Sequence, residues 1–236
     1  MQFINIHTHH PVIAEGIFEL VNLLPADTVS EQPRNNVWFS SGMHPWHLLQ
    51  ADAEYEFEKL ERLVLRHKRV IAVGEAGLDK ICKTDWSVQE YWFEKQIELS
   101  EKAQKPLIIH CLKAYNEILS FRKKTQPSQA WIIHGFNSSK QQALDLIDHG
   151  CYLSIGDLLL NKTSKIQQIL PELPLENIFL ETDDEPELAI ETIYLAVAKA
   201  MKIHPKELRP KIKANFERVF GVGVDEMEQE TVKGNR

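Results

Sequence analysis

Residues 70–109, VIAVGEAGLDKICKTDWSVQEYWFEKQIELSEKAQKPLII, contain the pattern that decides the fold class. The segment opens with the apolar run Val70–Val73 and closes with Leu107–Ile109, both typical of buried strands. Between them, Ser87–Ala103 presents apolar residues at helical spacing, which predicts a helix. A strand, a helix and a second strand in this order indicate a parallel β-α-β unit.

The same alternation extends over the rest of the chain. Further strand-like runs occur at Gln2–Ile6, Val37–Ser40, Trp131–Ile133, Tyr152–Ile155 and Ile178–Leu180, with a weaker candidate at Ile17–Leu23. Helical spacing also predicts helices around Phe57–His67, Ile193–Met201 and Leu208–Phe220, the last followed by Gly221 as a natural stop. Seven clear strands and one weak strand predict an α/β fold, a (β/α)8 barrel of the TIM type forming a single domain over residues 1–236.

Two features refine this prediction. An open, doubly wound sheet is disfavoured because no G-x-G-x-x-G motif follows the first strand. The segment from Thr8 to Gly16 leaves little room for a helix, so we expect a shortened or distorted first βα unit.

The composition restricts the class of protein, its cellular compartment and its partners. The hydrophobic fraction of 43% is ordinary for a globular protein, and no apolar run approaches a membrane span. Three cysteines and an N-terminal stretch without secretory character favour a reducing compartment, so we expect a cytoplasmic protein with no membrane partner. A net charge of −7 disfavours long-range attraction to nucleic acid, although bound divalent cations would reverse the local field.

Residues of metal-ligand type follow five separate predicted strands. His7 and His9 form an H-x-H pair, and because alternate residues of an extended segment face the same side, both can reach one ion. The other strands are followed by Glu75, His110, His134 and Asp183. The carboxyl ends of barrel strands carry the active site, so these six residues predict a metal centre there.

The competing interpretation of each residue is structural. A single histidine after a strand is usually a hydrogen-bonded structural residue, and Glu75 or Asp183 alone could cap the following helix. That explanation must hold independently at five strands, always at the same end. We therefore favour the metal site.

The motifs that carry these residues resemble those of the TatD family of metal-dependent hydrolases. This family includes the TatD-like deoxyribonucleases. The matching segments are, in family order, INIHTHH, SGMHPWHL, VIAVGEAGLD, PLIIHC, WIIHGF and FLETDD, and NFERVFG resembles the last helix. The resemblance covers nearly the whole chain, and the ordered set is specific.

The resemblance implies two divalent ions per chain. His7, His9, Glu75 and Asp183 would hold one ion, and Glu75, His110 and His134 the other, with Glu75 bridging. Two such ions can activate a water as nucleophile and stabilise the oxygens of a phosphoester. Asp183 and Glu75 would be the catalytic residues, with Asp183 as general base. Imidazole-rich ligation favours Zn, while the carboxylates keep Mg or Mn open.

The substrate side departs from the family pattern. The resemblance implies that His44 faces the substrate phosphate, and Trp46 could stack on a base or fill the pocket rim. Many family members carry an Arg where this chain has Leu112, and we expect Lys113 to be a substrate contact in its place, although an ammonium lacks the bidentate fork. Whether this change abolishes nuclease activity is open.

Hydrolysis of a phosphoester, in single-stranded DNA ends or a nucleotide-like small molecule, is the leading hypothesis. An amide or ester hydrolase of the amidohydrolase class is disfavoured because Glu75 stands where those enzymes often use a carboxylated lysine. A catalytically weak metal-binding module is the third hypothesis, and the complete ligand set opposes it. The sequence does not determine the substrate, the native metal or the oligomeric state.

Overall fold

A computed structural model describes residues 2–12, 14–25, 27, 36–48 and 52–223. Within them, eight strands pair in parallel and in chain order from β1 to β8. They are β1 (Phe3–Thr8), β2 (Ile17–Leu23), β3 (Val37–Ser41), β4 (Val70–Asp79), β5 (Leu107–Leu112), β6 (Trp131–Ile133), β7 (Cys151–Ile155) and β8 (Ile178–Leu180). The weak candidate is thus a complete strand, and the predicted TIM-type barrel is confirmed.

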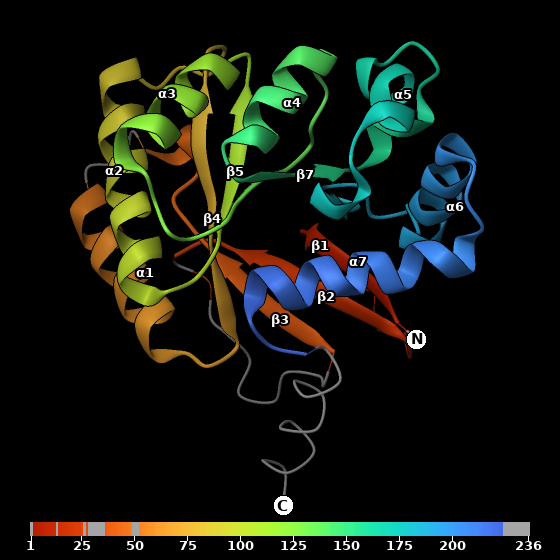
Figure 1. The fold of residues 1–236 in the computed structure, drawn as a ribbon. Coiled ribbons are helices and arrows are strands. Elements are labelled where there is room, and N and C mark those ends of the chain that lie inside the picture. Colours follow the sequence, from red (N-terminus) through yellow and green to blue (C-terminus); the bar gives the residue numbers. More distant parts are fainter. Residues whose placement is uncertain (1, 13, 26, 28–35, 49–51, 224–236) are drawn as a thin grey trace, which may run out of the picture.

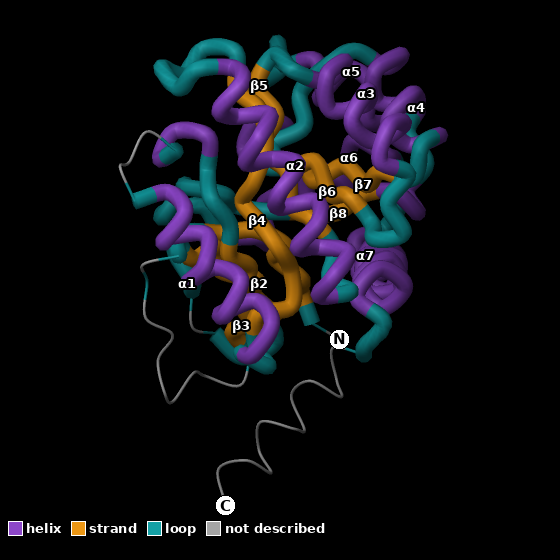
Figure 2. The backbone as a smooth tube through the Cα atoms, turned by 90° about the vertical axis from the view of Figure 1, so that its left-hand side faces the viewer, coloured by secondary structure: helices purple, strands orange, loops and turns teal. Residues whose placement is uncertain are grey.

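Helices surround this sheet (Figure 1). They are α1 (Ala53–Arg66), α2 (Trp86–Ala103), α3 (Tyr115–Thr125), α4 (Lys140–Asp148), α5 (Lys165–Ile169), α6 (Ile190–Met201) and α7 (Pro205–Phe220). Short 3-10 segments complete the connections at Pro45–His47 (η1), Asp157–Leu160 (η2), Leu170–Glu172 (η3) and Leu175–Asn177 (η4). Figure 2 shows α1 and α2 covering the outside of β3 and β4. None of the described helices has the length and apolar character needed to cross a membrane.

The first βα unit is shortened, as expected. The described residues of the connection from β1 to β2 form no helix. The C-terminal helix α7 instead lies against β1 and β8, and its Phe216 packs edge-on against Phe18 of β2, with ring centroids 4.8 Å apart. Gly221 ends α7 in the left-handed conformation, where its N–H donates to the Glu217 carbonyl at 2.9 Å.

The barrel closes at a narrow seam between β1 and β8. The two strands meet through a single parallel bridge between Thr8 and Asp183. Backbone hydrogen bonds join His9 N to Asp183 O at 3.0 Å and Asp183 N to His7 O at 3.1 Å. The closure of the barrel therefore places Asp183 directly beside the H-x-H pair.

Five strands are longer than the sequence predicted, and three of them include predicted metal-ligand residues. β1, β4 and β5 continue through His7, Glu75 and His110, which lie within the strands and not after them. The sequence prediction ended these strands with their apolar runs, at Ile6, Val73 and Ile109. Glu75 and His110 remain in their strands because β4 and β5 keep pairing as far as Asp79 and Leu112, and His7 remains in β1 because β1 pairs with β2 as far as Thr8.

Candidate metal centre

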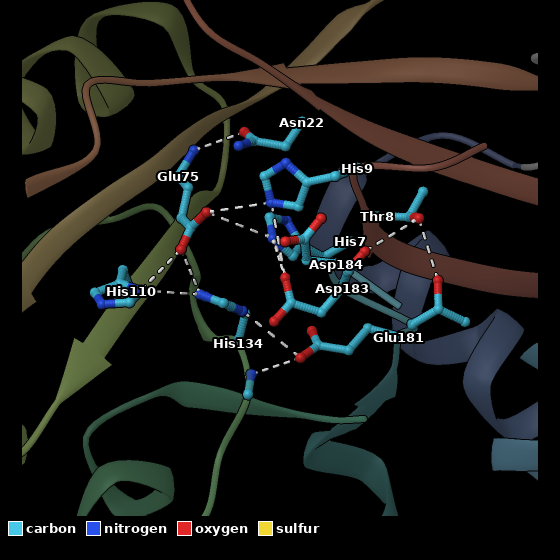
Figure 3. Close-up of polar contacts among 12 residues, drawn as sticks. His7, Thr8, His9, Asn22, Glu75, His110, His134, Glu181, Asp183 and Asp184 are labelled. Carbon is cyan, nitrogen blue, oxygen red and sulfur yellow. Dashed lines mark hydrogen bonds and ion pairs between the residues drawn. The ribbon is translucent and has the colours of Figure 1, made fainter. Parts of the chain in front are cut away.

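Six side chains with metal-ligand atoms converge at the carboxyl ends of the strands (Figure 3). Three lie in β1, β4 and β5, and the other three lie in the residues that follow β1, β6 and β8. All six were predicted from the sequence: His7, His9, Glu75, His110, His134 and Asp183. Glu75 is 4% exposed and lies at the centre of the group.

One carboxylate oxygen of Glu75 faces the H-x-H pair. Glu75 Oε2 lies 3.6 Å from His7 Nε2 and 3.7 Å from His9 Nε2. Asp183 Oδ1 closes this set at 3.4 Å from His7 Nε2 and 3.7 Å from His9 Nε2. Ligand atoms about 2.1 Å from one zinc ion, at tetrahedral corners, are about 3.4 Å apart, so the separations fit a shared cation.

The other oxygen of Glu75 faces a second set of imidazoles. Glu75 Oε1 lies 2.6 Å from His134 Nε2 and 2.9 Å from His110 Nδ1, and these two nitrogens are 3.4 Å apart. His44 Nε2 lies 3.2 Å from the same oxygen. Glu75 thus stands between two groups of nitrogen ligands.

A buried histidine supports the fit to a cation. His7 is fully buried, and neither of its ring nitrogens has a hydrogen-bond partner among the described residues. An unpaired buried polar group is costly, whereas a nitrogen that binds a metal is satisfied. The donor set of imidazoles and carboxylates suits a transition-metal dication.

The electrostatics of the site also indicate a place for positive charge. Burial alone would raise the pKa of Glu75, but the charge of His134 and the hydrogen bonds from His110 and His134 hold that pKa well below its ordinary value. Burial disfavours a charged His134, yet the Glu75 carboxylate raises its pKa well above the usual range. The pKa of Asp183, which burial would raise, is lowered to about 2 by His7 and His134.

Glycines let β4 approach β5 closely enough for Glu75 and His110 to meet. A Cβ atom on Gly74 would lie 2.4 Å from the Ile108 carbonyl oxygen, and one on Gly77 would lie 1.9 Å from that of His110. No side chain fits at either position. The backbone N–H of Glu75 donates to Asn22 Oδ1 on β2 at 2.9 Å, which fixes the strand at the ligand itself.

Sequence reasoning missed Glu181, which directly follows β8 and is fully buried below the site. It accepts a hydrogen bond from Gly135 N at 2.5 Å and lies 3.7 Å from His134 Nδ1 (Figure 3). A carboxylate behind a ligand histidine orients the imidazole and raises its basicity. The rule that selected Glu75 and Asp183, an acidic residue at a strand end, applies equally to Glu181.

The predicted substrate residues divide into two groups. His44 and Trp46 line a pocket of about 270 Å³ together with five of the six clustered residues, all except His7. The Nδ1 atom of His44 accepts the Trp46 backbone N–H at 3.2 Å, which directs Nε2 into the site, and burial lowers the pKa of His44. Lys113 is exposed beyond β5 and is not among the described residues that line this pocket. An exposed hydrogen bond joins His10 to Asp184 at the rim, at 2.7 Å.

A comparison with protein families identifies the chain. The family model of TatD-related DNases matches residues 18–221, which is most of the chain. This protein belongs to the TatD-related DNase family. The resemblance inferred from the ordered motifs is confirmed.

Individual relatives are similar over part of their length. An uncharacterized metal-dependent hydrolase of Haemophilus influenzae is 32% identical over 156 residues, which make up 63% of this chain and 59% of that protein. The human 3'-5' RNA nuclease TATDN2 is 35% identical over 156 residues, covering 62% of this chain and 20% of the human protein. The matched part of this TatD-family chain thus spans about three fifths of the bacterial relative.

The fold is shared with a solved structure. The crystal structure of YjjV, a TatD homologue from Escherichia coli K12, matches with a TM-score of 0.76 and covers 86% of both chains. At 21% sequence identity this likeness establishes the common barrel.

Proposed function

We propose that this TatD-family protein is a divalent-metal-dependent hydrolase that cleaves phosphoester bonds. His7, His9, Glu75 and Asp183 would hold one ion, and Glu75, His110 and His134 would hold a second. The observation that carries the proposal is the division of the ligands between the two oxygens of Glu75. We favour zinc because imidazoles predominate, with magnesium or manganese as alternatives.

Bound divalent ions would supply an activated water and stabilise the charge of the departing oxygen. The hydrogen bond from the Glu75 backbone N–H to Asn22 holds Glu75 between the two sets of ligands. Asp183 lies at the pocket, where burial would raise its pKa but His7 and His134 lower it to about 2, so its carboxylate is ionised at neutral pH. We assign it the role of general base because of its position beside the proposed ions. His44 is buried, and its Nε2 atom faces the site at 3.2 Å from Glu75 Oε1, from where it would donate to a substrate phosphate oxygen.

A short single-stranded end of DNA or RNA, or a nucleotide-like molecule, is the proposed substrate class. The net charge of −7 opposes binding along many phosphates, whereas a single end can enter the metal pocket. The printed name of the human relative, an RNA nuclease, supports a nucleic-acid substrate. We also propose a cytoplasmic location, in keeping with three unpaired cysteines.

The function is tested with chelator-treated protein reloaded with Zn, Mn or Mg and offered single-stranded oligonucleotides and an aryl phosphate. The substitution Asp183→Asn keeps the shape of the side chain but removes its negative charge. We expect kcat/KM to fall by about 10²–10⁴-fold. Asp148→Asn, an exposed position at the end of α4, is the matched control and should keep wild-type activity. Wild-type protein that binds metal but turns over neither substrate refutes the proposal.

A further inference from the structure

Asp79, the last residue of β4, lies outside the six-residue cluster but contacts two parts of the pocket. It is 1% exposed, and its Oδ2 atom accepts the indole N–H of Trp46 at 2.6 Å. The same oxygen lies 3.4 Å from His110 Nε2. Its other oxygen, Oδ1, accepts the backbone N–H groups of Ile81 at 2.8 Å and Cys82 at 3.2 Å. Both oxygens are therefore used.

The contact with His110 lies on the far side of the imidazole from the ligand cluster. His110 Nδ1 faces Glu75 at 2.9 Å, and Nε2 faces Asp79. A carboxylate that accepts from the second nitrogen of a ligand histidine fixes the tautomer and the orientation of the ring. Asp79 thus leaves Nδ1 as the nitrogen free to bind a cation.

The contact with Trp46 leaves an aromatic face open to solvent. Trp46 is 58% exposed, although its only polar side-chain atom is bonded to a buried carboxylate. The ring lies 6.0 Å from that of His110 and 4.9 Å from that of His44, measured between centroids. The part of the indole that remains available is apolar and planar, which suits a stacked nucleobase.

The surroundings hold Asp79 in place. The buried side chain of Gln89 accepts from Asp79 N at 2.8 Å and donates to Asp79 O at 3.0 Å. Gln89 also donates to the Thr84 carbonyl at 2.8 Å, and the Thr84 hydroxyl donates to Pro45 O at 2.6 Å. The η1 segment that carries Trp46 is therefore tied to the same buried network.

We infer that Asp79 is a positioning residue that couples the ligand His110 to a base-stacking platform formed by Trp46. A nucleobase stacked on the indole is thereby held at a fixed distance from the phosphate bound in the metal pocket. The inference rests on the proposed function for the identity of the ion and the substrate. Asp79 is the additional residue that aligns the imidazole of His110 with the indole of Trp46.

The substitution Asp79→Asn tests the coupling. Asparagine has one acceptor oxygen, and the Ile81 and Cys82 N–H groups would occupy it, so the amide NH2 would face the indole and His110. We expect Zn binding to the metal-free protein, measured by calorimetry, to weaken by about 10–100-fold. We also expect acrylamide to quench Trp46 more strongly, measured as the difference between each protein and its Trp46→Phe derivative.

Asp85→Asn is the matched control, because Asp85 is exposed on the same loop and its side chain does not cap α2. This variant should bind Zn and be quenched as the wild type is. If folded Asp79→Asn keeps its Zn affinity within about twofold, or if its Trp46 quenching is unchanged, the coupling is wrong. A wild-type protein that binds no divalent metal would instead refute the proposed function.

A measurement on the wild type covers the case in which Asp79→Asn does not fold. In the Zn-loaded protein, long-range 1H–15N correlation should show His110 protonated at Nε2 and unprotonated at Nδ1. The opposite tautomer would overturn the inference without any substitution.

Discussion

Two buried carboxylates differ in what surrounds them. Glu75 is 4% exposed, and imidazoles face both of its oxygens. Glu19, on β2, is 1% exposed, but its Oε2 atom has no hydrogen-bond partner among the described residues. Burial raises the pKa of Glu19 from 4.5 to about 7, only partly opposed by hydrogen bonds from Val12 and Asn5. Both carboxylates are buried, so the difference comes from their partners: the imidazoles keep Glu75 ionised, whereas burial favours the neutral form of Glu19.

The raised pKa of Glu19 predicts a pH-dependent stability. Between pH 4.5 and about 7 the folded chain retains a proton that the unfolded chain has released, so stability falls as pH rises through this window. Glu19→Gln removes the ionisation and should raise Tm at about pH 8, since an unpaired buried polar group costs about 1–3 kcal/mol. Thermal melts at both ends of the window measure this. An equal gain at about pH 5 would contradict it.

At the scale of elements, α7 substitutes for a helix that the first βα unit lacks. Its end at Gly221 was predicted from the sequence, because a glycine after an apolar stripe is a local signal. Its packing against β1 and β8 was not, because no local signal specifies a partner so distant in the chain. Phe216 contacts Phe18 and stacks on Phe220 at 4.3 Å, so one helix completes the core beneath the shortened unit.

Removing the aromatic ring of Phe216 should destabilise the barrel. Phe216 is fully buried, and Phe216→Ala should cost about 3–5 kcal/mol, with each kcal/mol lowering Tm by about 2–4 °C. Leu195→Ala on α6 is the control, because Leu195 is 58% exposed. The Tm of this variant should stay close to that of the wild type. Similar losses in both variants would show that α7 has no special role in the core.

At the scale of the whole molecule, the proposed metal centre depends on the closure of the barrel. The ligands come from five strands, and the last of them, Asp183, is hydrogen-bonded to the backbone of His7 and His9 across the seam. Asn5 reinforces the seam, accepting from Thr182 N at 3.1 Å and donating to Thr182 Oγ1 at 2.9 Å. A cation at the centre would therefore join the first strand to the last.

Removal of metal should consequently lower the stability of the entire barrel. A ligand present at about 1,000 times its Kd stabilises the folded state by about 4 kcal/mol, which corresponds to a Tm shift of about 8–16 °C. Calorimetry of the Zn-loaded protein with and without chelator measures the shift. In a His7→Ala/His9→Ala variant the shift should be much smaller. A full response in that variant would place the stabilising ion elsewhere.

The sequence by itself determined the order of strands, the barrel class and the identity of the six clustered residues. These follow from local signals: apolar periodicity, residue type and position at a strand end. The family resemblance already implied that Glu75 stands between two sets of ligands. Only the tertiary structure decided which of its oxygens faces each set, that Glu181 and Asp79 lie behind His134 and His110, and that Lys113 stays outside the pocket. Those relations depend on distances between residues far apart in the chain, which the closure of β8 onto β1 and the approach of β4 to β5 establish.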